Sequence, residues 1–373
     1  MQILILPGDG IGPEITSATV EILKAASHRF NLGLVLVEDV AGHESLRRYG
    51  ATVRPELLEQ AKAVDGIVLG PTATYDFKDE AKGEINPSKY FRKSLDLFAN
   101  IRPAKTYPGV PGRVGVFDLV VVRENTEGFY ADRNMEMGNG EILVTADTGI
   151  SLRRITRRCC ERIARSGFEL AMRRRRRVTL VHKANVLKTT DGLFLDECRK
   201  VAAEFPDVTV DDVLVDAMMA HVVRNPQRFD VIVTTNMFGD ILSDLTAELS
   251  GSLGLGGSLN AGFGYAMAQA AHGSAPDIAG KNIANPYSLI LSAALLLAWQ
   301  GQRQGKSEFE TAARTIEAAV EEAIVAHEVT ADIGGRLGTR EAGAALVRIL
   351  ADPGREGSGR QDPGRQDPGR QGA

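Results

Sequence analysis

Two aspartates in the segment RFDVIVTTNMFGDILSDL have a spacing that suits a metal site. The segment predicts a hydrophobic strand that ends at Asn236 and a helix that starts immediately after Gly239. Asp240 and Asp244 are four residues apart, so they share one face of this helix, at the carboxyl end of a strand. Their like charges repel unless a cation lies between them, and Mg²⁺ or Mn²⁺ prefers such oxygen ligands. Two aspartates on a solvated helix face are the simpler interpretation, and the pair alone favours it.

Other reactive side chains also follow predicted strands. Asp216, in LVDAMMAHVV, stands at the end of one strand, and Lys183 directly follows the buried strand of VTLVHKANVLK. A lysine at such a position can lose its hydration and accept a proton, whereas the phenol of Tyr130 can donate one. These residues add a possible acid and base to the possible metal ligands.

Three arginines lie near predicted strand ends and suit a substrate with several carboxylates. Arg92 and Arg102 are ten residues apart, and Arg123 opens the segment RENTEGFY after a strand. A guanidinium group holds a carboxylate through two parallel hydrogen bonds. For any one of the three, an ordinary surface arginine is the alternative.

A loop and a turn could approach a nucleotide. In AAHGSAPDIAG the backbone amides could contact phosphates, and Asp277 is placed like an acceptor for a ribose hydroxyl. GDGIGPE, residues 8–14, has the glycine pattern GxGxG followed by Pro13, which is not the GxGxxG of a Rossmann fold. A tight turn with proline opening the next helix explains these glycines.

Alternating strands and helices must position these residues, which indicates an α/β architecture with a substantial parallel component. Runs such as VFDLVVV are apolar on both faces, as strands covered by helices on both sides must be. The predicted strands are 2–6, 34–38, 66–69, 118–122, 177–182, 208–215 and 230–234. The predicted helices include 14–29, 54–61, 150–173 and 191–204.

Composition and charge limit the possible functions. The chain has 373 residues, 43% of them hydrophobic and 25% charged, and a net charge of −4, so it offers no overall basic field for nucleic acid. The arginines at 173–177 favour a solvated face, with nucleic-acid binding as the weaker alternative. The three cysteines, Cys159, Cys160 and Cys198, cannot build a disulfide framework, which indicates a reduced, cytoplasmic protein.

The sequence shows neither a signal-peptide pattern at its start nor an apolar run long enough for a membrane span. The first ten residues lack a signal-peptide pattern, and the longest apolar run, 289–299, is shorter than the roughly 18–20 residues of a membrane span. We therefore expect a buried helix at 289–299 and no membrane association. Residues 351–373 repeat RQDPG and contain almost nothing to bury, so we expect a disordered tail.

Together, in this order, the motifs resemble those of the β-decarboxylating isocitrate and isopropylmalate dehydrogenases. The resemblance runs from LPGDGIGPE to ADIGGRLGT, residues 331–339. It implies a two-domain α/β fold with a mixed sheet that is not a Rossmann fold. One domain would comprise residues 1–100 and 252–350, with the cofactor, and the other residues 101–251, with substrate, metal and dimer-interface elements.

The resemblance also implies a mechanism and a homodimer. Lys183 and Asp216 would reach into the partner's cleft, where Lys183, together with Asp216, accepts the C2 hydroxyl proton. Tyr130 would reprotonate C3 after decarboxylation. The malate moiety of the substrate would be held by Arg92, Arg102 and Arg123, and Mg²⁺ or Mn²⁺ by Asp216, Asp240 and Asp244.

A nucleotide site is implied as well. Its residues would be Ile11, Asn185, His272, Gly273, Ser274, Ala275, Pro276, Asp277 and Asn285. Relatives that use NADP carry basic and aromatic residues after HGxAP, whereas this chain has Asp277 and Ile278. A carboxylate binds a free 2′-hydroxyl and repels a 2′-phosphate, which favours NAD.

The substituent at C3 of the substrate is the part that varies within the family. Isocitrate enzymes have Ser and Asn six and four residues before the first arginine, and here these positions hold Asn86 and Ser88. Lys89 stands where homoisocitrate enzymes have arginine, with a solvent-exposed lysine as the alternative. Gln269 replaces a usual glutamate. The polar set favours an acidic substituent, as in isocitrate.

Several alternatives stay open. Isopropylmalate is the leading one, followed by homoisocitrate, tartrate and D-malate. A non-catalytic regulatory subunit on the same fold belongs to a different class, and such a protein would be expected to have lost the metal aspartates, the lysine or the tyrosine. All are present in this sequence.

Overall fold

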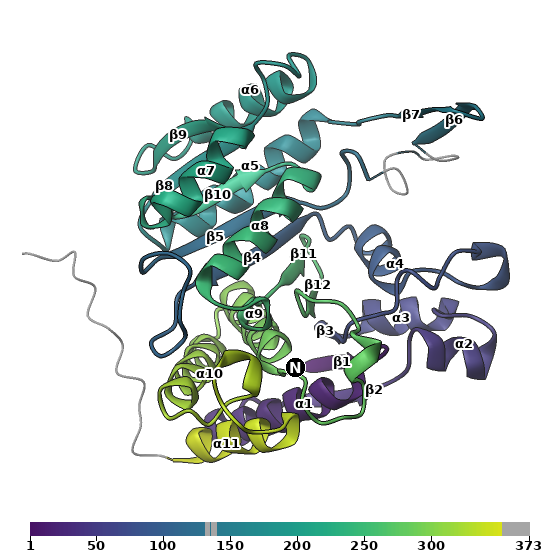
Figure 1. Ribbon diagram of the computed structural model, residues 1–373, viewed down its shortest axis with the longest axis vertical. Coiled ribbons are helices and arrows are strands. Elements are labelled where there is room, and N and C mark those ends of the chain that lie inside the picture. Colours follow the sequence, from purple (N-terminus) through teal and green to yellow (C-terminus); the bar gives the residue numbers. More distant parts are fainter. Residues whose placement is uncertain (131–134, 136–139, 353–373) are drawn as a thin grey trace, which may run out of the picture.

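The computed structural model describes residues 1–130, 135 and 140–352, and a mixed ten-stranded sheet runs through them (Figure 1). The predicted tail from residue 353 lies outside the described residues. The strand order is β2-β1-β3-β12-β11-β4-β5-β10-β8-β9. The strands of this sheet are β1 (Gln2–Leu6), β2 (Val35–Glu38), β3 (Gly66–Leu69), β4 (Ala99–Lys105), β5 (Asp118–Glu124), β8 (Arg177–His182), β9 (Thr209–Leu214), β10 (Val231–Thr234), β11 (Leu259–Ala261) and β12 (Ala266–Gln269).

Two parallel blocks make up this sheet, joined by antiparallel strands in the middle. β2, β1, β3 and β12 are parallel to one another, and so are β5, β10, β8 and β9. β11 and β4 pair antiparallel with their neighbours. The mixed sheet and the parallel component predicted from the sequence are confirmed.

Helices cover both faces of both blocks. The helices around the first block are α1 (Gly12–Phe30), α2 (His43–Tyr49), α3 (Pro55–Ala63), α4 (Pro87–Ser94), α9 (Tyr287–Gln304), α10 (Ser307–Val325) and α11 (Thr339–Ala351), and those of the second are α5 (Arg157–Met172), α6 (Thr190–Ala202), α7 (Val215–Arg224) and α8 (Asn236–Ser250). In β5, Val120 and Val122 pack with α5 and α6, whereas Val121 packs with α7 and α8. This alternation explains why the strand is apolar on both faces.

A separate hairpin of β6 (Glu141–Thr145) and β7 (Thr148–Ser151) projects from the body (Figure 1). The predicted helix at 150–173 is therefore wrong at its amino end. Residues 148–151 pair with β6, and the helix begins only at Arg157, where the Thr156 hydroxyl accepts a hydrogen bond from the amide of Cys159.

Three further boundaries differ from those predicted near the reactive residues. β10 ends at Thr234 and α8 begins at Asn236, so Gly239 lies inside the helix. Arg123 lies within β5 rather than after it. Asp216 lies in the first turn of α7 rather than at a strand end.

The arginines at 173–177 contact the protein itself. Arg174 pairs with Asp118 and Asp230 at 2.8 Å each, and Arg177 pairs with Asp211 at 2.9 Å. The side chain of Arg175 donates to backbone carbonyls. These contacts join the α5–β8 connection to neighbouring strands.

The apolar run at 289–299 is part of α9, a largely buried helix, as predicted. Among the helices that the structure describes, none combines the length and apolar character that a membrane crossing needs. The three cysteines are buried, and none of them forms a disulfide.

Candidate active site

The two predicted metal ligands on α8 lie against arginines from β4 and β5. Nη1 of Arg102 is 2.9 Å from Oδ1 of Asp244 and 3.5 Å from Oδ1 of Asp240. The guanidinium of Arg123 donates to Oδ1 of Asp240, and the hydroxyl of Tyr130 donates to Oδ2. The structure therefore brings these five predicted residues together.

The two carboxylates differ in their electrostatic surroundings. Burial alone would raise the pKa of Asp240, but the positive charges of Arg123 and Arg102 outweigh it and lower that pKa below its ordinary value. For Asp244, burial and the negative charge of Asp240 together raise the pKa despite Arg102. Asp240 is thus held ionised. Asp244 faces this like charge, and the guanidinium of Arg102, which contacts both carboxylates, offsets part of the repulsion.

Arg123 is positioned by the first turn of α8. It is 1% exposed, and Oδ1 of Asn236 accepts hydrogen bonds from its Nε at 2.9 Å and its Nη2 at 2.6 Å. A Cβ at Gly239 would lie 2.7 Å from Cβ of Arg123, so glycine is what lets the helix approach this strand. Asn236 and Gly239 were not assigned a role from the sequence, because neither carries charge.

Arg92, from α4, has a different set of contacts. Its Nη2 is 3.1 Å from Oε1 of Gln269, and the Ser88 hydroxyl donates to the same oxygen at 2.9 Å. Ser88 and Gln269 are both buried. Oδ1 of Asn125 lies 3.4 Å from Nη1 of Arg92. Gln269 thus joins two predicted substrate residues in one buried network.

Buried amides connect Arg92 to Arg102. The side-chain amides of Asn125 and Asn100 both donate to Oδ1 of Asn260, each at 3.1 Å. Oδ1 of Asn100 in turn accepts from Nε of Arg102 at 2.7 Å. These three asparagines were not predicted from the sequence. A polar residue in the middle of an apolar strand, as in FANIR and SLNAGF, is the signal that could have found two of them.

Two other predicted substrate residues have local partners. Oδ1 of Asn86 accepts from the amide of Lys89 at 3.2 Å and so caps α4. Nζ of Lys89 lies 2.7 Å from Oε1 of Glu80. Of Asn86, Ser88 and Lys89, it is therefore Ser88 that bonds to the same buried oxygen as Arg92, which is Oε1 of Gln269.

Lys183 and Asp216 form a second group. Nζ of Lys183 is 2.5 Å from Oδ1 of Asp216, and this hydrogen bond lowers the pKa of Asp216. The backbone amide of Lys183 is held by Asp191 at 2.5 Å. Within the described residues, no three His, Cys, Asp or Glu side chains are grouped to hold a metal ion, so Asp216 does not join Asp240 and Asp244 in this chain.

The predicted nucleotide loop packs against the glycine-rich turn. The amide of Ile11 donates to the carbonyl of Ser274 at 2.9 Å, and a Cβ at Gly10, whose φ is +59°, would lie 2.0 Å from that oxygen. Asp277 is exposed and has no hydrogen-bond or ion-pair partner among the residues that the structure describes. Burial lowers the pKa of His272, which favours its neutral form.

The other two predicted nucleotide residues are placed differently. The amide of Asn285 lies 2.9 Å from Oδ2 of Asp332, next to Gly254. Asn185 is in the turn after β8, five strand positions from β12, which is roughly 24 Å at 4.8 Å per strand. One chain therefore does not bring Asn185 to the loop at 272–277.

The profile of the isocitrate/isopropylmalate dehydrogenases matches residues 2–346. The chain belongs to this family. It is 40% identical to a 3-isopropylmalate dehydrogenase of Methanothermobacter thermautotrophicus, covering 94% of this chain and 99% of the relative. It is 41% identical to an isocitrate/homoisocitrate dehydrogenase of Thermus thermophilus, over 94% and 98%. The solved isocitrate dehydrogenase of Methylococcus capsulatus superimposes with a TM-score of 0.83 at 39% identity, over 94% and 99%.

The chain is thus a β-decarboxylating dehydrogenase of this family, whose members act on small hydroxy acids with a nicotinamide cofactor and a divalent metal. Its residues fit both. Asp240 and Asp244 offer hard carboxylate oxygens on one helix face. The loop at 272–277 offers backbone amides and the exposed carboxylate of Asp277.

Proposed function

We propose that the chain catalyses NAD-dependent oxidative decarboxylation of a malate with an acidic substituent at C3, isocitrate or a similar tricarboxylate. The observation that carries this proposal is the buried contact of Ser88 and Arg92 with the neutral Gln269. These polar groups can pair with an anionic substituent, whereas an isopropyl group would leave them facing an apolar surface.

The chain's own residues account for binding and proton transfer. Arg92, Arg102 and Arg123 hold the carboxylates of the malate moiety. Lys183 would accept the C2 hydroxyl proton, and NAD, when bound, would supply the acceptor for the hydride of C2. After the carboxylate on C3 has left as CO₂, Tyr130 gives a proton to C3. Asp240, which accepts a hydrogen bond from the Tyr130 hydroxyl, fixes the position of that donor.

The Mg²⁺ or Mn²⁺ site of this proposal has ligands from two copies of the chain. Asp240 and Asp244 of one copy and Asp216 of the other would hold the cation, which stabilises negative charge on the substrate oxygens when bound. The separation of Asp216 from the other two in one chain supports this arrangement.

A homodimer follows from the same proposal. The hairpin of β6 and β7 supports it, because four of its apolar side chains are 47–75% exposed: Ile142, Leu143, Val144 and Ile150. The proposed domains are residues 1–100 with 252–350, and 101–251. Lys183, Asp216 and Asn185 of one copy would complete the site of the other.

The choice of NAD rests on Asp277. Its exposed carboxylate can accept hydrogen bonds from the ribose hydroxyls of NAD. A 2′-phosphate at the same place would meet a like charge, so NADP should be used less efficiently.

3-Isopropylmalate is the second candidate substrate, because several relatives at 40–42% identity are named 3-isopropylmalate dehydrogenases. NADH formation should be followed with isocitrate and with isopropylmalate, each with Mn²⁺ and again with EDTA. Metal-dependent turnover of isocitrate alone supports the proposal. Turnover of isopropylmalate alone contradicts the acidic substituent, and inactivity with both acids and with homoisocitrate, tartrate and D-malate would favour a regulatory subunit.

A further inference from the structure

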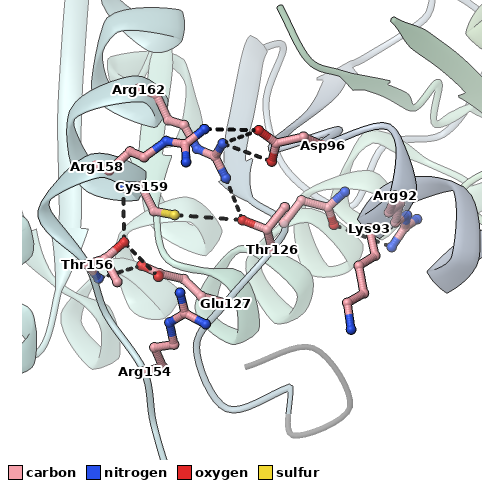
Figure 2. Close-up of a pocket in the computed structure, with 11 residues that line it drawn as sticks. Arg92, Lys93, Asp96, Thr126, Glu127, Arg154, Thr156, Arg158, Cys159 and Arg162 are labelled. Carbon is pink, nitrogen blue, oxygen red and sulfur yellow. Dashed lines mark hydrogen bonds and ion pairs between the residues drawn. The ribbon is translucent and has the colours of Figure 1, made fainter. Parts of the chain in front are cut away.

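A cavity of about 210 Å³ lies beside Arg92, on the side toward α5 (Figure 2). Its walls come from α4, from residues 125–127 after β5, and from the start of α5. Five basic side chains line it against two acidic ones, Asp96 and Glu127. The basic residues are Arg92, Lys93, Arg154, Arg158 and Arg162.

Both acidic side chains are engaged by the protein. The carboxylate of Asp96 accepts two hydrogen bonds from Nη1 of Arg162, at 2.9 and 2.7 Å. That of Glu127 is 2% exposed and accepts from the amide and hydroxyl of Thr156, at 2.8 and 2.9 Å. Figure 2 shows these bonds in the cavity wall. The two carboxylates keep their negative charges, so the five basic side chains leave a surplus of three positive charges in the lining.

Two cations at the rim are available to a ligand. Lys93 is exposed and, within residues 1–130, 135 and 140–352, has no hydrogen-bond or ion-pair partner. The side chain of Arg158 is 76% exposed, and its nearest carboxylate, Asp96, is 3.5 Å away. The ammonium and the guanidinium both favour phosphate oxygens as acceptors.

The amino end of α5 adds to this positive potential. The helix has 16 residues, and Thr156, Arg158 and Cys159 at its start all line the cavity. The amino end of a helix carries a partial positive charge and favours anions. The cavity thus combines side-chain cations with a helix terminus. In its wall, Nε of the buried Arg162 has no hydrogen-bond partner among the residues that the structure describes.

We propose that this cavity binds a tetrahedral dianion, either free phosphate or the phosphate group of a small metabolite, between Lys93, Arg158 and the start of α5. The site adjoins the proposed clamp on the substrate, because Arg92 of the clamp and its neighbour Asn125 also line the cavity. The carbonyl of Glu127 also accepts from the amide of Asn236 at 2.8 Å, and Asn236 holds Arg123. Through these contacts we expect one effect on catalysis, which rests on the proposed function. Bound phosphate raises the KM for the acidic substrate to a plateau and leaves kcat unchanged.

Calorimetric titration of the full chain with inorganic phosphate at low salt tests the site without any turnover. The double variant Lys93→Gln/Arg158→Gln should bind phosphate at least about tenfold more weakly, because it loses two charge-assisted contacts. A matched control removes the same charge outside the cavity. In Lys62→Gln/Arg348→Gln, Lys62 pairs with Glu59 and Arg348 with Glu328, and the affinity should stay within about twofold of the parent chain.

Saturable binding that the first variant loses and the control keeps supports the site. A second titration with glycerol 3-phosphate identifies the source, because the tighter of the two ligands is the better model of the natural one. Equal affinity in all three proteins would place the ion elsewhere, for example on the three arginines of the clamp, and would overturn the proposal. Absence of saturable binding of either ligand would overturn it as well. An inactive enzyme that still binds phosphate at this site would contradict only the proposed function.

Discussion

The two groups of reactive side chains differ in how completely their own chain surrounds them. The group around Asp240 includes Arg123, whose side chain is 2% exposed and whose position is fixed by Asn236. In the other group, Lys183 and Asp216 are 25% and 64% exposed at the side chain and contact each other. The first group is assembled within one fold, whereas the second is presented at a surface where another copy can complete it.

Asp240→Asn should have the largest effect on the complete group. It removes the charge that balances Arg123 and one proposed metal ligand, so kcat/KM should fall on the order of 10³-fold. Asp207→Asn, at an exposed position in the α6–β9 connection, is the control and should retain full activity. Activity within tenfold of the parent chain for Asp240→Asn would remove this carboxylate from the proposed machinery.

Asn236→Ala tests whether the buried contact of Asn236 with Arg123 matters for stability and activity. Arg123 would lose the oxygen that accepts from its Nε and Nη2, which should cost about 2–3 kcal/mol of unfolding free energy and lower kcat/KM about 100-fold. Denaturant unfolding and initial rates measure the two effects. Asn236→Asp keeps an acceptor for Arg123 but loses the amide that donates to the carbonyl of Glu127, so its activity should lie between those of the parent chain and of Asn236→Ala. Equal losses in both variants would show that acceptance by this side chain is not what positions Arg123.

Gln269→Glu tests whether Gln269 helps to select an acidic substituent at C3 of the substrate. A carboxylate at this position adds a negative charge beside Ser88 and Arg92, so it should lower kcat/KM for isocitrate about tenfold. The ratio of kcat/KM for isocitrate to that for isopropylmalate is the readout, because a general loss of packing would lower both. An unchanged ratio would contradict the role given to Gln269.

Glu127 provides a contrast to Asp240, since burial raises its pKa to about 6. An acid with a raised folded-state pKa destabilises the fold as pH rises from the unfolded value near 4.3 to about 6, by about 2 kcal/mol in total. Urea unfolding from pH 4 to 7 should show this decline in the parent chain and lose it in Glu127→Gln. The same slope in both proteins would mean that Glu127 is not the titrating group.

Apolar runs located the buried strands β5, β8 and β10, and the partly exposed edge strand β9 was also predicted. β4, β11 and β12 were not predicted. Asn100 in β4 and Asn260 in β11 interrupt the apolar pattern of those strands, and their amides face a polar network that only the folded chain reveals. β12 has only four residues. The start of α5 was misplaced because β7 exists only through its pairing with β6.

The candidate site was predictable where charge marked it. Asp240, Asp244, Arg102, Arg123 and Tyr130 lie together as expected. The neutral residues that hold them, such as Asn236 and Asn125, gave no comparable signal, because an amide in a loop or a first helical turn is common for many reasons. Their importance depends on partners more than a hundred residues away in the chain.

In the proposed function, two copies of the chain share one active site, and mixing two inactive variants tests this sharing directly. Asp240→Asn lacks the first group and Lys183→Ala the second, and each variant alone should be inactive. Equal amounts, dissociated and reassembled together, form half mixed dimers, each with one intact site, so about a quarter of the parent activity should return. A mixture that stays inactive, while the parent chain treated in the same way recovers, would contradict the shared site.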